Sequence, residues 1–221
     1  MFGSAVEDYL KTVYKLSQRT SRVTPSAVAE AQGVSLAAVT KMVKRLKELR
    51  LVTYERGRGI ELTAGGTKVA LEIIRHHRLL EVYLKEALGY SWDQVDGEAE
   101  ILEHVISEEF EDRIDAMLGH PTHDPHGAPI PTKDLEIDAT VHPPLVEMEP
   151  GQKGRVARVS DEDPAMLRYL GDLGIYPAAG VELLGREPFG GPYRVRIDGR
   201  EHRIGEELAR NVFVSLGGNV S

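Results

Sequence analysis

Glutamate and histidine residues in the acidic middle of the chain are spaced as metal ligands would be. Glu100, Glu103 and His104 stand at i, i+3 and i+4, so one helix would present all three on the same face. His77 and Glu81 repeat the i, i+4 spacing in the preceding helical stretch, and Glu-x-x-His pairs on facing helices are a known way to build a metal site. The alternative is a solvated acidic helix. Two unpaired carboxylates near a core boundary repel each other, however, and a divalent cation removes that cost.

A segment rich in proline and histidine supplies a second candidate cluster. His120, His123 and His126 surround Asp124 there, and a loop without a metal is the alternative interpretation. The chain holds no cysteine, which excludes disulfides, thiolate metal sites and iron–sulfur clusters. Carboxylate and imidazole ligands favour harder divalent ions, so Mn²⁺ fits best, with Fe²⁺ and Zn²⁺ as alternatives.

The motifs of common enzymes are absent from the sequence. It contains no Gly-x-Ser-x-Gly, no GxxxxGK[ST] phosphate loop and no His-Glu-x-x-His. We therefore predict that the protein is not an enzyme, and keep a carboxylate-bridged metalloenzyme as a hypothesis of a different class. No apolar run approaches the ~20 residues of a bilayer span, and the first residues lack the pattern of a signal peptide. We expect a cytoplasmic protein with no membrane partner.

The formal net charge of −8 conceals an uneven distribution. Residues 1–75 carry 13 Lys and Arg against 7 Asp and Glu, whereas residues 76–140 carry 4 against 16. A basic first third suggests a region that binds a polyanion, and an acidic middle suggests a region that concentrates cations. The length of 221 residues is sufficient for two or three small domains.

The basic first third has the pattern of a winged helix-turn-helix. Apolar periodicity predicts helices over residues 7–16, 25–33 and 36–50, with capping residues and glycine at their ends. Two short strands, residues 51–54 and 60–63, flank a basic turn that contains glycine and are typical of a wing. A small α+β domain with a solvated basic face is the alternative.

The rest of the chain divides into a helical part and a β-rich part. Residues 64–88 and 97–118 are predicted as two long helices, and residues 120–150 contain little regular structure. From residue 151 onward, short alternating segments predict a five-stranded, partly open barrel with one helix at 164–173. The first long helix has more apolar residues than one helix face can hold, and we expect a partner subunit to bury the surplus. These residues are Leu79, Leu80, Val82, Tyr83, Leu84 and Leu88.

The order of these parts resembles the diphtheria toxin repressor family of metal-dependent transcription regulators. Five motifs carry the resemblance in chain order, namely EDYL (7–10), VTKMV (39–43), HRLLE (77–81), EAEILEH (98–104) and PHGAPIP (125–131). The resemblance covers essentially the whole chain and is to the manganese-sensing branch with a C-terminal SH3-like domain of the FeoA type.

This resemblance implies a multidomain fold with a mainly α N-terminal part and a small C-terminal SH3-like β barrel. Residues 1–72 would form the winged helix-turn-helix DNA-binding domain. Residues 73–141 would form a helical dimerisation and metal-binding domain, and residues 148–221 the FeoA-type domain.

The resemblance further implies a primary metal site made of Asp8, Glu100, Glu103 and His104. Iron-sensing relatives have Met and Cys where Asp8 and Glu100 stand, so this set looks like that of the manganese branch and agrees with the ligand chemistry. Lys11 stands where some manganese-sensing members have a glutamate that helps to bind a second, adjacent metal. Because an ammonium group cannot ligate, we expect no closely spaced pair of metals here.

The resemblance also implies a separate ancillary metal site that would attach the barrel to the helices. Asp163 would be its ligand from the barrel, and Asp161 is the alternative because residues 160–163 align loosely with the family. Mn²⁺ is the expected cofactor, Fe²⁺ is the alternative, and Zn²⁺ or Cd²⁺ would substitute in vitro. The implied ancillary ligands are His77, Glu81, Asp124, His126 and Asp163.

The family pattern implies a homodimer that binds palindromic double-stranded operator DNA when loaded with metal, as a repressor of metal-uptake genes. Without metal, Asp8 and the acidic trio would repel each other; bound Mn²⁺ would join them and orient both recognition helices toward successive major grooves. A regulator that senses an organic ligand is the alternative. Contacts to bases and phosphates would come from the exposed end of the third helix and from the wing: Ser35, Ala37, Thr40, Lys41, Lys44, Arg56 and Arg58.

Overall fold

The computed structural model describes residues 2–217 and begins with a compact winged-helix unit, the head. Its elements, in chain order, are α1 (Ser4–Ser17), α2 (Pro25–Gln32), α3 (Leu36–Glu48), β1 (Val52–Glu55) and β2 (Gly59–Leu62). The expected caps form: Thr24 accepts a hydrogen bond from the backbone of α2, and Ser35 does the same for α3. A common core then fixes α3 on the surface of the head with one face open.

Three helices follow the head: α4 (Ala64–Leu88), α5 (Val95–Leu102) and α6 (Glu108–Met117). The prediction of a single helix over residues 97–118 is wrong, because the chain turns between α5 and α6. Ser107 caps α6 through the backbone N–H of Phe110, and three glutamates fill the first turn of α6, where the helix dipole favours negative charge. Glu103 therefore stands at the C-terminal end of α5, and His104 lies in the turn that follows it.

A long connection with one 3₁₀ turn, η1 (Leu145–Glu147), leads into the C-terminal domain. That domain contains the five strands that were predicted, in an antiparallel sheet. The strand order is β6-β5-β4-β3-β7, with bulges in β3 and β4. Helix α7 was predicted and the short α8 was not. The elements are β3 (Lys153–Val159), α7 (Pro164–Asp172), β4 (Gly180–Arg186), β5 (Tyr193–Ile197), β6 (Arg200–Ile204), α8 (Glu206–Arg210) and β7 (Val212–Leu216).

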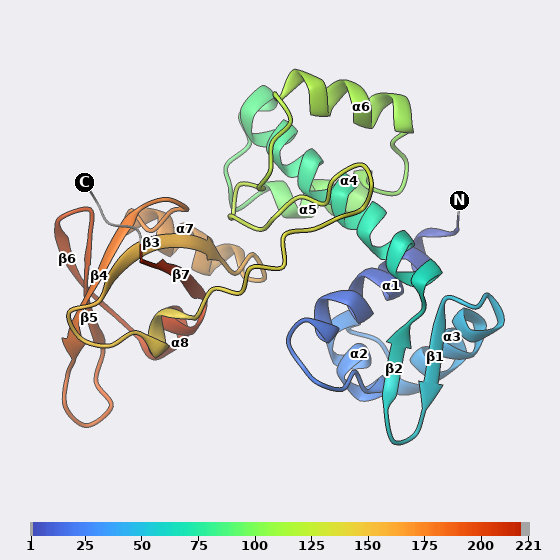
Figure 1. Cartoon of the computed structure of the whole chain (residues 1–221), viewed down its shortest axis with the longest axis horizontal. Helices are drawn as coiled ribbons and strands as arrows, with labels where there is room; N and C mark the ends of the chain where they lie inside the picture. Colours follow the sequence, from blue (N-terminus) through green and yellow to red (C-terminus); the bar gives the residue numbers. More distant parts are fainter. Residues whose placement is uncertain (1, 218–221) are drawn as a thin grey trace.

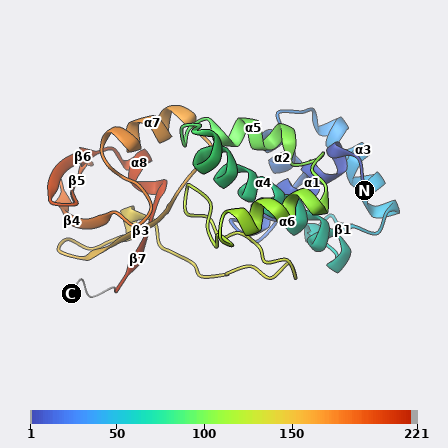
Figure 2. The same ribbon diagram turned by 90° about the horizontal axis from the view of Figure 1, so that it is seen from above.

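Figure 1 shows the head and the C-terminal sheet at opposite ends, with α4, α5 and α6 between them. Figure 2 shows the same three parts from above. Helix α4 is the central element, because both α1 and α5 pack against it. We call α4, α5 and α6 the helical domain. Residues from the head and from the helical domain therefore meet along α4. Among the described residues, no helix is long and apolar enough to cross a membrane.

The apolar surplus of α4 is used differently from the prediction. Leu79, Leu80 and Leu84 are buried inside the chain against α5 and α6, so they are not left for a partner. Of the predicted set, Leu88 is 55% exposed. Other exposed apolar side chains lie on α6 and on and after α5, among them Ile101 (68%), Val105 (73%), Phe110 and Met117.

Candidate metal centre

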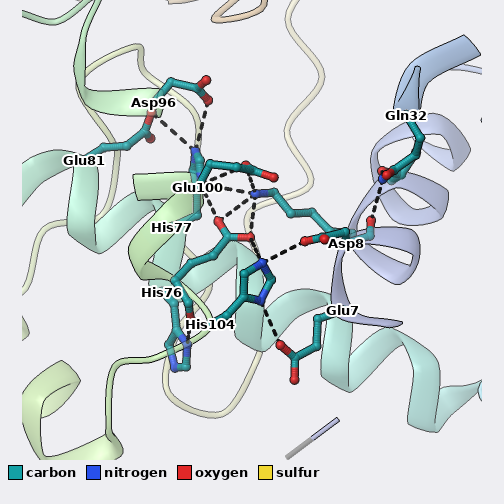
Figure 3. A network of polar contacts seen from close by, with 12 residues as sticks. Glu7, Asp8, Gln32, His76, His77, Glu81, Asp96, Glu100 and His104 are labelled. Carbon is teal, nitrogen blue, oxygen red and sulfur yellow. Dashed lines mark hydrogen bonds and ion pairs between the residues drawn. The ribbon is translucent and has the colours of Figure 1, made fainter. Parts of the chain in front are cut away.

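Helix α1 of the head and the turn after α5 bring three predicted ligands together. The Nε2 atom of His104 lies 2.8 Å from Oδ1 of Asp8 and 3.4 Å from Oε1 of Glu103. One ligand atom from each of the three lies within 4.8 Å of the others, a spacing that one cation can bridge. Figure 3 shows His104 between Asp8 on one side and Glu7 on the other. We call these three residues, with Glu100, the primary cluster.

Glu100 is the exception in the primary cluster, because it faces Lys11 and not Asp8. The Lys11 ammonium donates to Glu100 at 2.6 Å and to both oxygens of Glu103 at 2.8 and 2.7 Å, and it lies 3.2 Å from Nδ1 of His77. Ligand atoms of His77, Glu100 and Glu103 themselves lie within 4.8 Å of one another. A lysine ammonium therefore lies among a second set of atoms spaced as metal ligands.

The charges in this region explain its pKa shifts. Burial would lower the pKa of Lys11, but the carboxylates of Glu103 and Glu100 outweigh burial and raise it. Burial would raise the pKa of Glu103, but His77 and Lys11 outweigh burial and lower it. The pKa of Asp8 is raised, first by burial and then by neighbouring carboxylates that His104 only partly offsets. His77 and Lys11 thus keep Glu103 ionised, whereas at Asp8 the opposing effect of His104 does not outweigh burial.

A buried network holds the turn that carries Glu103. The ring Nδ1–H of His76 donates to the backbone carbonyl of Glu103 at 3.0 Å, and its Nε2 lies 3.2 Å from Glu111 on α6. Arg75 pairs with the same Glu111 and with Asp115. Helix α4 therefore fixes both α6 and the break before it, which explains how an interrupted helix still presents its ligands.

Glu7 is a residue that the spacing argument missed. Its carboxylate is buried and lies 2.8 Å from Nδ1 of His104, so the Nδ1–H donates to it. That hydrogen bond leaves Nε2 as the free ring nitrogen, facing Asp8 and Glu103. A carboxylate next to Asp8 in the sequence was the available signal.

A second cluster lies between α4 and the connection that leads to the C-terminal domain. Glu81, Asp124 and His126 are all buried, and one ligand atom from each lies within 4.8 Å of the others. We call these three residues the ancillary cluster. One oxygen of Asp124 accepts from the backbone N–H groups of His126 and Ala128, which closes the turn and points the other oxygen inward.

Several ligand atoms here have no hydrogen-bond partner among the described residues. They are both oxygens of Glu81, Oδ2 of Asp124 and Nδ1 of His126. Buried polar atoms without partners are costly, and a divalent cation among them would satisfy all four. The ligand atoms present therefore fit a cation that prefers oxygen and nitrogen.

The charges of the ancillary cluster shift two pKa values in the same direction. Burial and the neighbouring Glu81 carboxylate raise the pKa of Asp124 to about 6. Burial would lower the pKa of His126, but Glu81 outweighs burial and raises it to about 9. Both pKa values are raised by the negative charge of Glu81. A bound cation would offset that charge and lower both pKa values.

His77 connects the two clusters instead of belonging to one. Its Nδ1 lies 2.5 Å from Glu103, and its Nε2 lies 3.6 Å from Glu81 and 3.3 Å from Asp96. His77, Glu81 and Asp96 form a further group of closely spaced ligand atoms. Asp96 was not predicted, because the expected helix began at Gly97, whereas α5 begins at Val95.

Three predicted ligand candidates lie elsewhere. Asp163 is exposed and caps α7 by accepting from the backbone N–H of Ala165 at 2.8 Å, and it is not among the closely spaced ligand groups of residues 2–217. The alternative, Asp161, lies close enough to Glu81 and His126 to interact with their charges. His120 and His123 are exposed and bond to their own neighbours, so the proline-rich segment contributes only Asp124 and His126.

The predicted DNA-contacting residues all lie on the open surface of the head. The N-terminal half of α3 is exposed apart from Val39, and Arg56 and Arg58 lie in the tight turn between β1 and β2. Ser35, Ala37, Thr40, Lys41 and Lys44 share the exposed side of α3. The arrangement offers a helix end with hydroxyl and ammonium groups beside a basic wing, which suits a duplex groove and its phosphates.

Three family profiles match successive parts of the chain. Residues 1–60 match the iron dependent repressor N-terminal DNA binding domain, and residues 63–132 match the iron dependent repressor metal binding and dimerisation domain. Residues 144–216 match the FeoA domain.

Individual proteins agree with these profiles. The iron-dependent repressor IdeR of Mycobacterium leprae (strain TN) is 36% identical over 125 residues, 57% of this chain and 54% of that protein, so the match spans about half of such relatives. The transcriptional regulator MntR of Shouchella clausii (strain KSM-K16) is 37% identical over 114 residues, 52% of this chain and 79% of that protein. A solved manganese-dependent transcriptional repressor in complex with manganese has a TM-score of 0.90 and 38% identity, covering 96% of this chain and 100% of that one.

A winged-helix head, a helical domain with clustered carboxylate and imidazole ligands, and a FeoA domain together define a class, the metal-dependent transcriptional repressors. The chain belongs to the iron-dependent repressor family, whose members include the diphtheria toxin repressor. The predicted family and fold class are confirmed. The alternatives of an organic-ligand sensor and a metalloenzyme find no support among these relatives.

Proposed function

We propose that this protein is a manganese-dependent dimeric repressor of metal-uptake genes that binds palindromic operator DNA when loaded with metal. One observation carries the proposal: Asp8 on α1 of the head and His104 after α5 point their ligand atoms at the same position. A cation bound there joins the head to the helical domain and so fixes the orientation of α3.

The metal is chosen by the available ligands. The primary cluster offers carboxylate oxygen and imidazole nitrogen, and the chain has no cysteine, which favours Mn²⁺, with Fe²⁺ as the alternative effector. Solved structures of the relative ScaR contain Zn²⁺ or Cd²⁺, and we expect both ions to substitute here in vitro. In the ancillary cluster, Glu81, Asp124 and His126 would hold a second ion, with Asp161 as the ligand from the C-terminal domain.

The remaining parts of the proposal follow from surfaces. A second copy would cover the exposed apolar side chains Ile101, Val105 and Met117, giving a homodimer. In each copy, residues 1–72 would bind one half of the operator, residues 73–141 would dimerise and bind metal, and residues 148–221 would form the FeoA-type domain. The protein would act in the cytoplasm, where operator DNA lies.

An anaerobic titration with Mn²⁺, Fe²⁺ and Zn²⁺ tests the proposal. The readout is binding to random duplexes, followed by selection and sequencing of the enriched sites. We expect enrichment of a palindrome only with metal. With Mn²⁺, enrichment should begin at the lowest free metal concentration when each concentration is expressed as a multiple of that metal's dissociation constant. Equal enrichment in the presence of a chelator would contradict metal dependence, and a half-site without a palindrome would contradict the dimer.

A further inference from the structure

Trp92, the single tryptophan of the chain, precedes α5, yet its side chain belongs to the core of the C-terminal domain. It is 8% exposed and packs in one cluster with residues such as Leu167, Leu170 and Ile175. All the other residues of this core lie between residues 145 and 214. The core of the C-terminal domain is therefore completed by a residue from the helical domain.

The fit around the indole is close. The ring of Tyr176 lies 4.7 Å from that of Trp92, and Gly171 of α7 faces both. A Cβ at Gly171 would lie 3.3 Å from Nε1 of Trp92 and 2.8 Å from the Tyr176 hydroxyl, so a larger residue would have to push one of them away. Next to the indole, Asp93 pairs with Arg168 of α7 at 3.0 Å.

Trp92 also holds His126 of the ancillary cluster. The backbone carbonyl of Trp92 lies 2.7 Å from Nε2 of His126, and the two rings are 5.8 Å apart. Because a carbonyl only accepts, Nε2 carries a proton, and Nδ1 faces Glu81 at 3.4 Å. The hydrogen bond thus sets which nitrogen of His126 is presented to the cluster.

Strand β3 closes the other side of the His126 loop. The His126 carbonyl accepts from the backbone N–H of Val159 at 2.9 Å. Gly127 has a φ of +89°, and a Cβ there would collide with the carbonyl of Ala157. His126 is therefore held between the backbone of Trp92 and β3, and the contact with β3 requires the C-terminal domain to be docked.

We infer that Trp92 is a positioning residue: its indole docks the C-terminal domain onto the helical domain, and its carbonyl thereby holds His126 in place for a cation in the ancillary cluster. The inference rests on the proposed metal binding at Glu81, Asp124 and His126. The contact of Trp92 with the C-terminal domain would thus set the metal affinity of the ancillary cluster but not that of the primary cluster.

The test measures Mn²⁺ binding to the full chain by anaerobic calorimetry. Loss in Glu81→Ala identifies the ancillary component of binding, and loss in Glu103→Ala identifies the primary one. We expect Trp92→Ala to weaken the ancillary component by about 10- to 100-fold, the range for residues that orient metal ligands, and to leave the primary one within about twofold. Trp92→Phe should restore most of the affinity, because phenylalanine keeps the contact with Tyr176.

Two further variants make the test specific. Gly171→Ala leaves Trp92 in the sequence but intrudes on its indole, so it should reproduce the selective ancillary loss. Tyr169→Ala, on the exposed side of the same helix, is the matched control and should change neither component. Circular dichroism confirms that each variant is folded.

The fluorescence of Trp92 supplies an independent readout. Mn²⁺ bound beside His126 should quench it in the wild type and in Glu103→Ala, but not in Glu81→Ala. Unchanged ancillary affinity in a folded Trp92→Ala, or equal weakening of both components, would overturn the positioning role alone. Absence of any Glu81-dependent Mn²⁺ binding in the wild type would overturn the role of this cluster in the proposed function as well.

Discussion

The primary and ancillary clusters differ in which cationic side chain the protein places among their carboxylates. In the primary cluster, Lys11 bonds to Glu100 and to both oxygens of Glu103. In the ancillary cluster no lysine enters, and both oxygens of Glu81 lack hydrogen-bond partners among residues 2–217. The primary carboxylates are paired with a lysine ammonium, whereas the ancillary carboxylates have the imidazoles of His77 and His126 beside Glu81 and the guanidinium of Arg78 at 3.5 Å from Asp124.

This difference corrects the simple picture of a cation that overcomes repulsion between helices. The expectation was that Asp8 and the acidic trio repel each other until metal binds. Lys11 already offsets much of the charge of that trio, and Asp8 lies against His104. Metal at the primary cluster is therefore expected to change head orientation more than stability, and metal at the ancillary cluster to stabilise a costly group of buried acceptors.

The largest expected effect is on DNA binding through the primary cluster. Glu103→Ala should abolish Mn²⁺-stimulated operator binding, a loss of about 100-fold, the upper range of coupling between two sites, and leave dimerisation intact. Gel shift combined with sedimentation measures both properties. Glu108→Ala, an exposed glutamate on α6, is the control. A full metal response in Glu103→Ala would refute the role of this cluster.

The next effect concerns stability. An ion at about 100 times its dissociation constant adds about 2.7 kcal/mol, or about 5–10 °C in melting temperature for a chain of this size. Glu81→Gln should lose the increment due to the ancillary cluster. In the presence of a chelator, Glu103→Gln should be less stable than the wild type because it deprives Lys11 of a partner. Glu81→Gln should also be less stable, because it deprives His77 and His126 of a carboxylate partner. Thermal melts with and without Mn²⁺ measure both effects, and an undiminished Mn²⁺ increment in Glu81→Gln would contradict the role of the ancillary cluster.

Replacing the internal cation should change the number of metals. Lys11→Glu removes the ammonium and adds a ligand beside His77, Glu100 and Glu103, so we expect about one additional Mn²⁺ per subunit by equilibrium dialysis. Lys85→Glu on the exposed end of α4 makes the same charge change away from the clusters. Unchanged stoichiometry in Lys11→Glu would count against the role assigned to this lysine.

The smallest effect concerns the network that supports the primary cluster. Burial would raise the pKa of Glu111, but hydrogen bonds from His76 and Arg75 outweigh burial and lower it from 4.5. Its ionised form therefore stabilises the fold above about pH 4.5, and this stability is lost as the pH falls through the lower folded value. Glu111→Gln should cost about 1–3 kcal/mol near pH 7 and less in acid. Urea melts at both pH values measure the difference, and an equal cost at both would contradict the assignment.

Local signals in the sequence were sufficient for much of this architecture. Caps, glycines and apolar periodicity predicted α2, α3, α4 and α7 close to their observed ends, because these features act within a few residues. The same reasoning extended one helix through residues 103–107. The cap at Ser107 was legible, but the hydrogen bond from His76 to the carbonyl of Glu103 comes from a distant helix.

The candidate ligands divide in the same way. The sequence by itself determined the donor chemistry: carboxylates and imidazoles at helical spacing, a complete lack of thiolate, and a basic head followed by an acidic middle. Only the tertiary structure decided that Lys11 lies among the carboxylates, that Asp161 interacts with the charges of the ancillary cluster while Asp163 caps a helix, and that Trp92 enters the core of another domain. The physical reason is the distance along the chain over which each kind of signal acts. Spacing determines which side chains share a face of one element, whereas their burial, their pKa values and their partners depend on how separate elements pack.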